Sequence, residues 1–167
     1  MRVSLCALFC AAALLLSFVE IPLIPAAPFL KYDPSTIMAL VAGLAFGPAT
    51  GAVVAVLPWC VHLFIEPVGA FIAMITALCV TLVTAWLYAL HRTKVQGVLA
   101  LVVGGFVQVV LALLLNLWLT PLYTGISFEA VCALVLPFLL PFNVVKAILN
   151  ASVTFIMYKP LSRLIGQ

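Results

Sequence analysis

Residues 97–119, GVLALVVGGFVQVVLALLLNLWL, decide the class of fold. The stretch contains no charged residue, and a helix that spans a bilayer needs about 20 consecutive apolar residues. The rest of the chain is similar, because 68% of its 167 residues are hydrophobic and only 7% are charged. A soluble domain carries roughly 25% charged residues. The composition therefore predicts an all-α membrane protein, and the net charge of +3 is too small and too scattered to indicate a nucleic-acid partner.

Working outward from this stretch, the chain reads as six apolar segments in one transmembrane domain that spans residues 1–167. These segments are Val3–Leu23, Thr36–Phe46, Ala49–Ile65, Val68–Leu90, Gly97–Leu119 and Val131–Tyr158. The second is short and the sixth is long, so the number of crossings needs an independent argument. The N-terminus imitates a secretory signal, with Pro25-Ala26-Ala27 after the apolar run, but we expect a helix that remains in the bundle.

The basic residues supply that argument, since they concentrate on the cytoplasmic side of membrane proteins. Three clusters without acidic residues lie before the first segment, between the fourth and fifth, and after the sixth: Arg2; His91, Arg92 and Lys94; Lys159 and Arg163. If all three clusters lie in the cytoplasm, an even number of membrane crossings must separate each cluster from the next. Six helices meet this requirement, with four crossings between the first two clusters and two between the second and third. We therefore predict a compact six-helix bundle with cytoplasmic N and C termini, in the plasma membrane.

The segment from Pro22 to Pro34 contains four prolines and cannot lie inside a helix. It is predicted to be an outer loop that is long for a connection between two neighbouring helices. Long ordered loops in compact domains are usually functional, so we favour a lid over a plain connector. At the other end of the second segment, Gly47-Pro48 predicts a tight turn between two closely packed helices.

A polar stripe crosses the sixth segment, where Asn143, Lys146 and Asn150 follow one another at i, i+3 and i+7. These positions share one face of a helix. An ionisable residue inside a membrane is costly and commonly functional. We favour a ligand site that opens to the outside; the alternative is an ion pair between Lys146 and an acid such as Glu20 or Glu66.

The sequence offers little for catalysis or metal binding. It contains no HExxH, no GxSxG and no phosphate-binding loop, and its five cysteines have no metal-ligand spacing. His62 and Glu66, four residues apart, favour a simple interfacial hydrogen bond. An intramembrane enzyme remains an alternative, although Ser17 and His62 have no evident partner. A small structural membrane protein is a further alternative, but it would not need Lys146.

Three stretches carry a resemblance to a known family: Phe29–Ser35 (FLKYDPS), Leu44–Gly51 (LAFGPATG) and Leu140–Lys146 (LPFNVVK). The chain resembles the substrate-binding S-components of energy-coupling factor (ECF) vitamin transporters, and it is most similar to the riboflavin-specific group. That resemblance implies six helices and an outward-facing substrate pocket, capped by the loop between the first two helices. It also implies a substrate-capture subunit for riboflavin or a related vitamin, with no resident cofactor.

The resemblance further implies partners and site residues. A transmembrane coupling subunit would dock on the small-residue face that carries Ala7 and Ala11, and two cytoplasmic ATPases would supply energy. Asn116, Asn143 and Lys146 are expected to contact the polar edge of a flavin. Aromatic side chains, among them Trp59 and Tyr123, would form its walls. The substrate-binding residues predicted from this reasoning are Tyr32, Asp33, Asn116, Trp118, Phe142, Asn143 and Lys146.

Overall fold

The computed structural model describes residues 2–27 and 30–164, and side chains over residues 3–27 and 30–158. Phe29, which begins the first of the three stretches, lies outside the described residues, as do the side chains of Arg2, Lys159 and Arg163. The described chain forms α1 (Arg2–Ser17), β1 (Ile21–Pro22), β2 (Lys31–Tyr32), α2 (Ser35–Phe46), α3 (Pro48–His62), α4 (Pro67–His91), α5 (Lys94–Thr124), α6 (Phe128–Leu134), the π-helix η1 (Val135–Leu139) and α7 (Leu140–Leu164).

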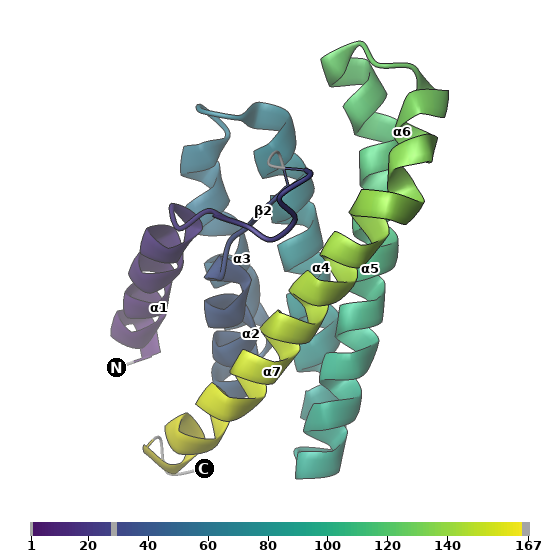
Figure 1. Cartoon of the computed structure of the whole chain (residues 1–167). Helices are drawn as coiled ribbons and strands as arrows, with labels where there is room; N and C mark the ends of the chain where they lie inside the picture. The colour runs from purple at the N-terminus through teal and green to yellow at the C-terminus, as the bar shows by residue number, and fades with distance from the viewer. Residues whose placement is uncertain (1, 28–29, 165–167) are drawn as a thin grey trace.

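Within the described part of the chain the helices make six rods, because α6, η1 and α7 follow one another without a break (Figure 1). Three stretches are long and apolar enough to cross a membrane: Pro67–His91, Lys94–Thr124 and Phe128–Tyr158. The helices α1, α2 and α3 are also apolar but shorter. The predicted helical class is therefore confirmed, and the rods correspond in order to the six predicted segments.

The first predicted segment was too long, because α1 ends at Ser17 rather than at Leu23. The Ser17 hydroxyl donates to the Leu14 carbonyl at 2.7 Å, which satisfies one of the free carbonyls at the helix end. Pro22 has no N–H to continue a helix. The chain instead becomes extended, and Ile21 pairs with Tyr32 in a two-stranded antiparallel ribbon that the sequence did not predict.

The sixth rod also differs from its prediction, since it begins at Phe128 and contains a π-helical turn. Pro141 cannot donate a backbone hydrogen bond to residue 137, so the regular pattern cannot be kept at that point. The Leu140 N–H donates to the Val135 carbonyl, five residues back. Such π-turns often occur at functional sites, and this one directly precedes the polar stripe of α7.

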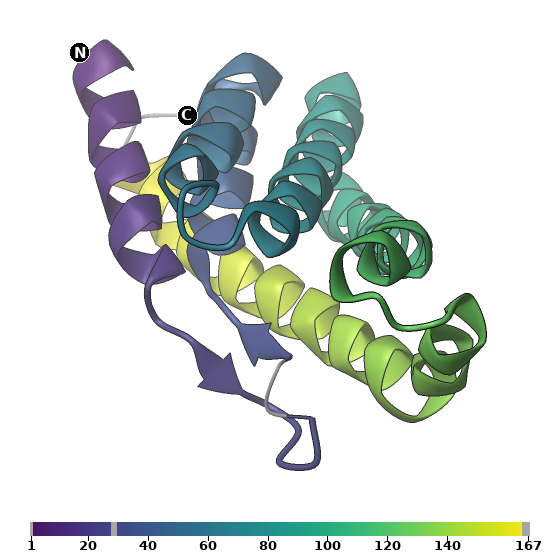
Figure 2. The same cartoon turned by 90° about the horizontal axis from the view of Figure 1, so that it is seen from above.

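The packing is centred on α2, which contacts α1, α3, α4 and α7 (Figure 2). The turn at Gly47 has a φ of 99°, a conformation that favours glycine, and Pro48 begins α3 directly after it. A Cβ atom added to Gly51 would lie 2.7 Å from the Cα atom of Gly43. The tight turn and the close approach of α2 to α3 are therefore both confirmed.

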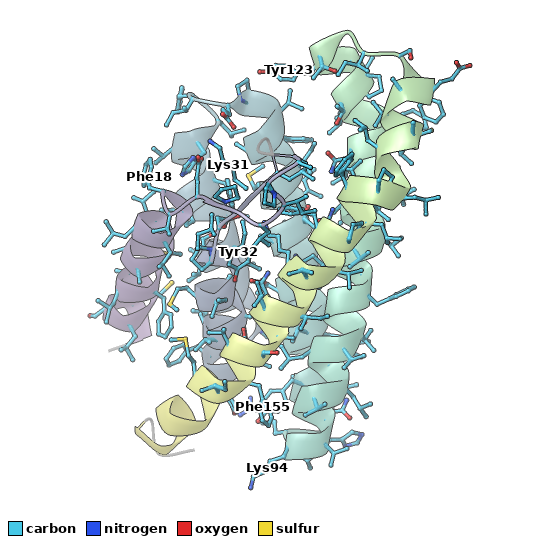
Figure 3. All side chains as sticks on the ribbon, in the orientation of Figure 1. Phe18, Lys31, Tyr32, Lys94, Tyr123 and Phe155 are labelled. Atoms are coloured by element: carbon cyan, nitrogen blue, oxygen red, sulfur yellow. The ribbon has the colours of Figure 1, made fainter. Side chains whose placement is uncertain are left out.

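The two ends of the bundle carry different features. Lys31 and Tyr32 of the ribbon, together with Tyr123 near the end of α5, lie toward one end, while Lys94 and Phe155 lie toward the other (Figure 3). Helix α1 begins and α7 ends away from the ribbon (Figure 1). The cavity described next opens near the ribbon.

Candidate functional site

A cavity of about 580 Å³ lies between the ribbon and the helices. Small-molecule sites commonly occupy about 300–1,000 Å³, so the space suits a ligand of vitamin size. Side chains reach it from the ends of α1 and α3, from the loop before α2, and from α4, α5 and α7. The lining includes Ser17, Asp33, His62, Gln108, Asn116, Phe142, Asn143 and Lys146.

The principal charged feature of the cavity is an ion pair between α7 and the loop. The Lys146 ammonium lies 2.9 Å from Asp33 Oδ2, and the two side chains are only 14% and 8% exposed. Asp33 Oδ1 also accepts a hydrogen bond from the Ser35 hydroxyl. Both charges line the cavity. The alternative of an ion pair for Lys146 is thus realised, but its partner is a loop residue rather than Glu20 or Glu66.

Two asparagines on neighbouring rods line the same cavity as this ion pair, Asn143 from α7 and Asn116 from α5. The Asn143 side-chain amide donates to the Leu139 carbonyl at 2.8 Å, at the end of the π-turn. The Asn116 amide donates to the Ala112 carbonyl at 2.7 Å. No described residue donates a hydrogen bond to the Asn143 amide oxygen. This oxygen is not one of the buried atoms that are both inaccessible to solvent and without a hydrogen-bond partner. Each asparagine is thereby held in a fixed orientation while it lines the cavity.

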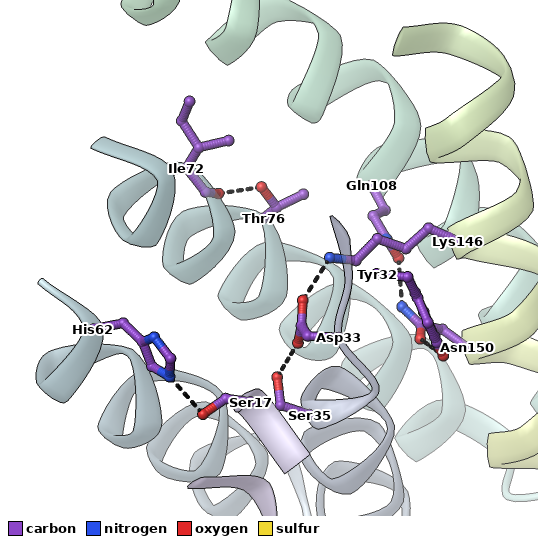
Figure 4. A network of polar contacts seen from close by, with 10 residues as sticks. All are labelled: Ser17, Tyr32, Asp33, Ser35, His62, Ile72, Thr76, Gln108, Lys146 and Asn150. Carbon is purple, nitrogen blue, oxygen red and sulfur yellow. Dashed lines mark hydrogen bonds and ion pairs between the residues drawn. The ribbon is translucent and has the colours of Figure 1, made fainter. Parts of the chain in front are cut away.

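Beside the ion pair, three polar side chains connect the loop to the bundle (Figure 4). The Tyr32 hydroxyl donates to Asn150 Oδ1 at 3.1 Å, and Asn150 Nδ2 donates to Gln108 Oε1 at 3.5 Å. Tyr32 is buried but is not part of the lining, so its place is that of an anchor for the loop. The i, i+7 spacing placed Asn150 on the polar face of α7, but no spacing along the chain pairs it with Tyr32 or Gln108.

The predicted aromatic residues divide into two groups. Phe142, Trp59 and Tyr123 line the cavity. Trp118 does not: it lies outside the lining and is 74% exposed. Trp118 follows Asn116 by two positions, or about 200° around an α-helix, so both cannot face the same cavity. The prediction of Trp118 as a substrate-binding residue is therefore wrong, and its exposed indole suits the lipid boundary instead.

Ser17 and His62 form a contact that sequence reasoning missed. His62 Nε2 lies 2.8 Å from the Ser17 hydroxyl, and both side chains are buried in the cavity wall. They belong to α1 and α3, and no sequence spacing could have paired them. The Ser17 hydroxyl hydrogen is donated to the Leu14 carbonyl. The imidazole therefore does not accept the serine proton, as the base of a serine nucleophile would.

Charges also surround the mouth of the cavity. Lys31 forms an ion pair with Glu20 and shares the lining with Glu66. The hydrogen bond and the charge of the Glu20 carboxylate raise the pKa of Lys31 above its ordinary value. With Asp33 and Lys146 neutralising each other, Glu66 leaves an excess of negative charge at the mouth. Within the described residues, no cluster of three potential ligands exists that could hold a metal ion.

The predicted docking face lies elsewhere, on the exposed side of α1. Ala7 and Ala11 are both exposed and are one helical turn apart. Cys10 and Ala13 of the same helix are buried against α2 and α3. The small side chains therefore lie on a surface that the bundle itself does not use.

Three similarities to known proteins bear on this fold and site. Residues 2–158 match the family described as ECF transporter, substrate-specific component. Over 166 residues the chain is 26% identical to a Staphylococcus aureus (strain TCH60) protein named riboflavin transporter RibU, covering 94% of this chain and 88% of that protein. A solved structure described as the S component of a bacterial ECF transporter superposes with a TM-score of 0.85, at 23% identity, covering 99% and 98% of the two chains.

The apolar rods, and the open cavity lined by both polar and apolar side chains, define a helical membrane protein with a small-molecule site between its helices. The family match over nearly the whole chain is more specific. This chain belongs to the substrate-specific components of ECF transporters, and it is a multi-pass protein of the prokaryotic cell membrane. The family is a transporter component and not a class of enzyme.

Proposed function

We propose that this protein captures riboflavin from outside the cell and delivers it for import. The observation that carries the proposal is that Lys146, Asn143 and Asn116, supplied by α7 and α5, all line this one cavity. An isoalloxazine ring presents amide-like donors and acceptors along one edge. The two asparagines can donate or accept there, and a lysine can donate to a ring carbonyl. The similarity to a riboflavin transporter supports the same ligand.

The charge of the site favours a neutral ligand. Asp33 already neutralises Lys146, and Glu20 and Glu66 stand at the mouth. A phosphorylated flavin would meet this negative charge, while both lysines of the described lining are already paired with carboxylates. Phe142 and Trp59 supply apolar surface for a planar ring. We therefore assign the unphosphorylated vitamin, with Asp33 holding Lys146 in place.

In the membrane we assign six crossings, with the ribbon outside and both termini in the cytoplasm. Residues 1–167 act as one transmembrane domain. Lys94 lies at the end of the bundle opposite to the ribbon, as the distribution of basic residues requires (Figure 3). Ala7 and Ala11 form the surface for a transmembrane coupling subunit, and two cytoplasmic ATPases drive the cycle.

Riboflavin fluorescence provides the test of this proposal. The protein, purified in mild detergent, is titrated into riboflavin, and the quenching gives the dissociation constant. We expect saturable binding, with little competition from flavin mononucleotide. Thiamine, biotin and a folate are tested in parallel by thermal stabilisation. Stabilisation by one of these without riboflavin quenching would show that the same fold serves another vitamin.

A further inference from the structure

The wall formed by α1 and α3 contains a polar group that the flavin ring edge does not use. His62 is 8% exposed and lines the cavity at the end of α3, while Ser17 lines it at the end of α1. Lys146 lies on α7 and Asn116 on α5. Helix α3 packs on α1, α2 and α4, whereas α7 packs on α2 and α5. In Figure 4, His62 and Ser17 lie on the side of Asp33 away from Lys146.

The hydrogen bonds around Ser17 determine which nitrogen of His62 carries a hydrogen. A serine hydroxyl has one hydrogen, and here it is donated to the Leu14 carbonyl at 2.7 Å. In the contact of 2.8 Å with His62 Nε2, the serine oxygen must therefore accept. A neutral imidazole carries only one N–H, so Nδ1 is left as an acceptor.

Nδ1 has no hydrogen bond to any described residue, and it is not among the polar atoms sealed from solvent. Its acceptor is thus reachable in the cavity wall. The ring itself is firmly held, because its centroid lies 4.7 Å from that of Phe18 and 5.2 Å from that of Trp59. A buried, oriented acceptor without a protein partner requires a hydrogen-bond donor from elsewhere.

We propose that His62 and Ser17 form a subsite for a hydroxyl-bearing chain, with His62 Nδ1 accepting from a ligand hydroxyl. This subsite rests on the proposed function, in which the ring edge occupies the opposite wall near Lys146. The ligand class is then an aromatic ring that carries a polyol, and the ribityl chain of riboflavin has this chemistry. His62 contacts the ligand, and Ser17 acts as a positioning residue that fixes the histidine tautomer.

The proposal predicts that the two halves of the ligand depend on different residues. Lumiflavin carries a methyl group in place of the ribityl chain, so it serves as the ring-only probe. The variant His62→Phe keeps an aromatic ring between Phe18 and Trp59 but loses the acceptor. Riboflavin affinity is expected to fall about three- to tenfold, the effect of one hydrogen bond, while lumiflavin affinity stays unchanged. Ser17→Ala is expected to show the same selective loss, to a smaller degree.

Fluorescence quenching measures both ligands on each purified variant, and retained lumiflavin binding also shows that a variant is folded. Unchanged riboflavin affinity in His62→Phe overturns the subsite. Equal losses for the two ligands overturn it as well, because His62 would then support the ring or the fold. Equal wild-type affinities for riboflavin and lumiflavin overturn the subsite alone and leave the flavin assignment standing. Wild-type protein that binds neither flavin overturns the proposed function and the subsite together.

Discussion

At the scale of single residues, the contribution of the Lys146 charge to stability depends on its partner, Asp33. An unpaired ammonium would be costly inside the bundle, and its removal would then stabilise the fold. The structure instead places Asp33 at 2.9 Å, with both groups largely buried. Removing one member of a buried ion pair leaves the other uncompensated, which typically costs about 3–5 kcal/mol. The expected effect of neutralising Lys146 on stability therefore reverses in sign.

The first prediction separates the effect of Lys146 on stability from its effect on ligand binding. Lys146→Met is expected to lower the thermal stability of the purified protein, and Asp33→Asn in the same chain to restore much of it. Riboflavin affinity should stay at least about tenfold weaker in both variants, since the donor to the ring is missing. Thermal unfolding and fluorescence quenching measure the two effects. Recovery of wild-type affinity in the double variant would limit Lys146 to a structural role.

The second prediction concerns Asn143, whose amide is oriented by the Leu139 carbonyl. Asn143→Leu is expected to weaken riboflavin binding by about three- to tenfold. Together with Lys146→Met, the loss should be smaller than the sum of the single losses, because both residues hold the same ring edge. A double-mutant cycle from four dissociation constants gives the coupling. Strictly additive losses would place the two side chains on separate parts of the ligand.

At the scale of elements, the ribbon between α1 and α2 covers a cavity and is anchored at its base. The Tyr32–Asn150 hydrogen bond joins β2 to α7, and the Asp33–Lys146 pair joins the following residue to the same helix. A segment held at two adjacent points can stay closed over a ligand and open only when both contacts break. Loops of this kind commonly set the rate of ligand release.

The third prediction tests this closure through its anchor. Tyr32→Phe removes the hydrogen bond to Asn150 and is expected to raise the riboflavin dissociation rate about three- to tenfold, with a smaller change in the association rate. Stopped-flow fluorescence measures both rates. Tyr88→Phe is the matched control, because it removes a tyrosine–tyrosine hydrogen bond of 2.7 Å away from the ribbon. Equal rate changes in the two variants would argue against closure by the loop.

The fourth prediction concerns the exposed face of α1. Ala7→Phe or Ala11→Phe should prevent close approach of a partner helix, so riboflavin uptake by cells should fall. Binding by the isolated subunit should be unaffected, because neither residue lines the cavity. Val102→Phe, at an exposed position of α5, is the control for an enlarged apolar surface. Loss of binding together with uptake would assign the face to the internal fold.

At the scale of the whole molecule, the fifth prediction is topological. In a chain whose five cysteines are replaced, single cysteines at Val95 and Ile126 report the two ends of α5, because both positions are exposed. In intact cells an impermeant maleimide should label the cysteine at position 126 and spare the one at position 95. Labelling of both after permeabilisation is the control for reactivity. The reverse pattern in intact cells would invert the assigned orientation.

The amino-acid sequence by itself determined the class of fold and the order of its rods. Long apolar runs such as residues 97–119 have only one stable form in lipid, a helix that satisfies its own backbone. Proline placed the break after α1, and Gly47-Pro48 placed the turn before α3. The i, i+3, i+7 spacing placed Asn143, Lys146 and Asn150 on one face of α7. These are local properties, and local spacing is sufficient to predict them.

Only the tertiary structure decided which distant residues meet. The Asp33–Lys146 and Ser17–His62 contacts join segments 113 and 45 residues apart, and the β ribbon pairs Ile21 with Tyr32. Trp118 turned outward because Asn116, two positions away, faces the cavity. Such contacts depend on how whole rods pack, and a polar group inside lipid accepts whichever partner that packing brings near. The spacing of residues along one rod therefore does not predict which distant residue becomes the partner.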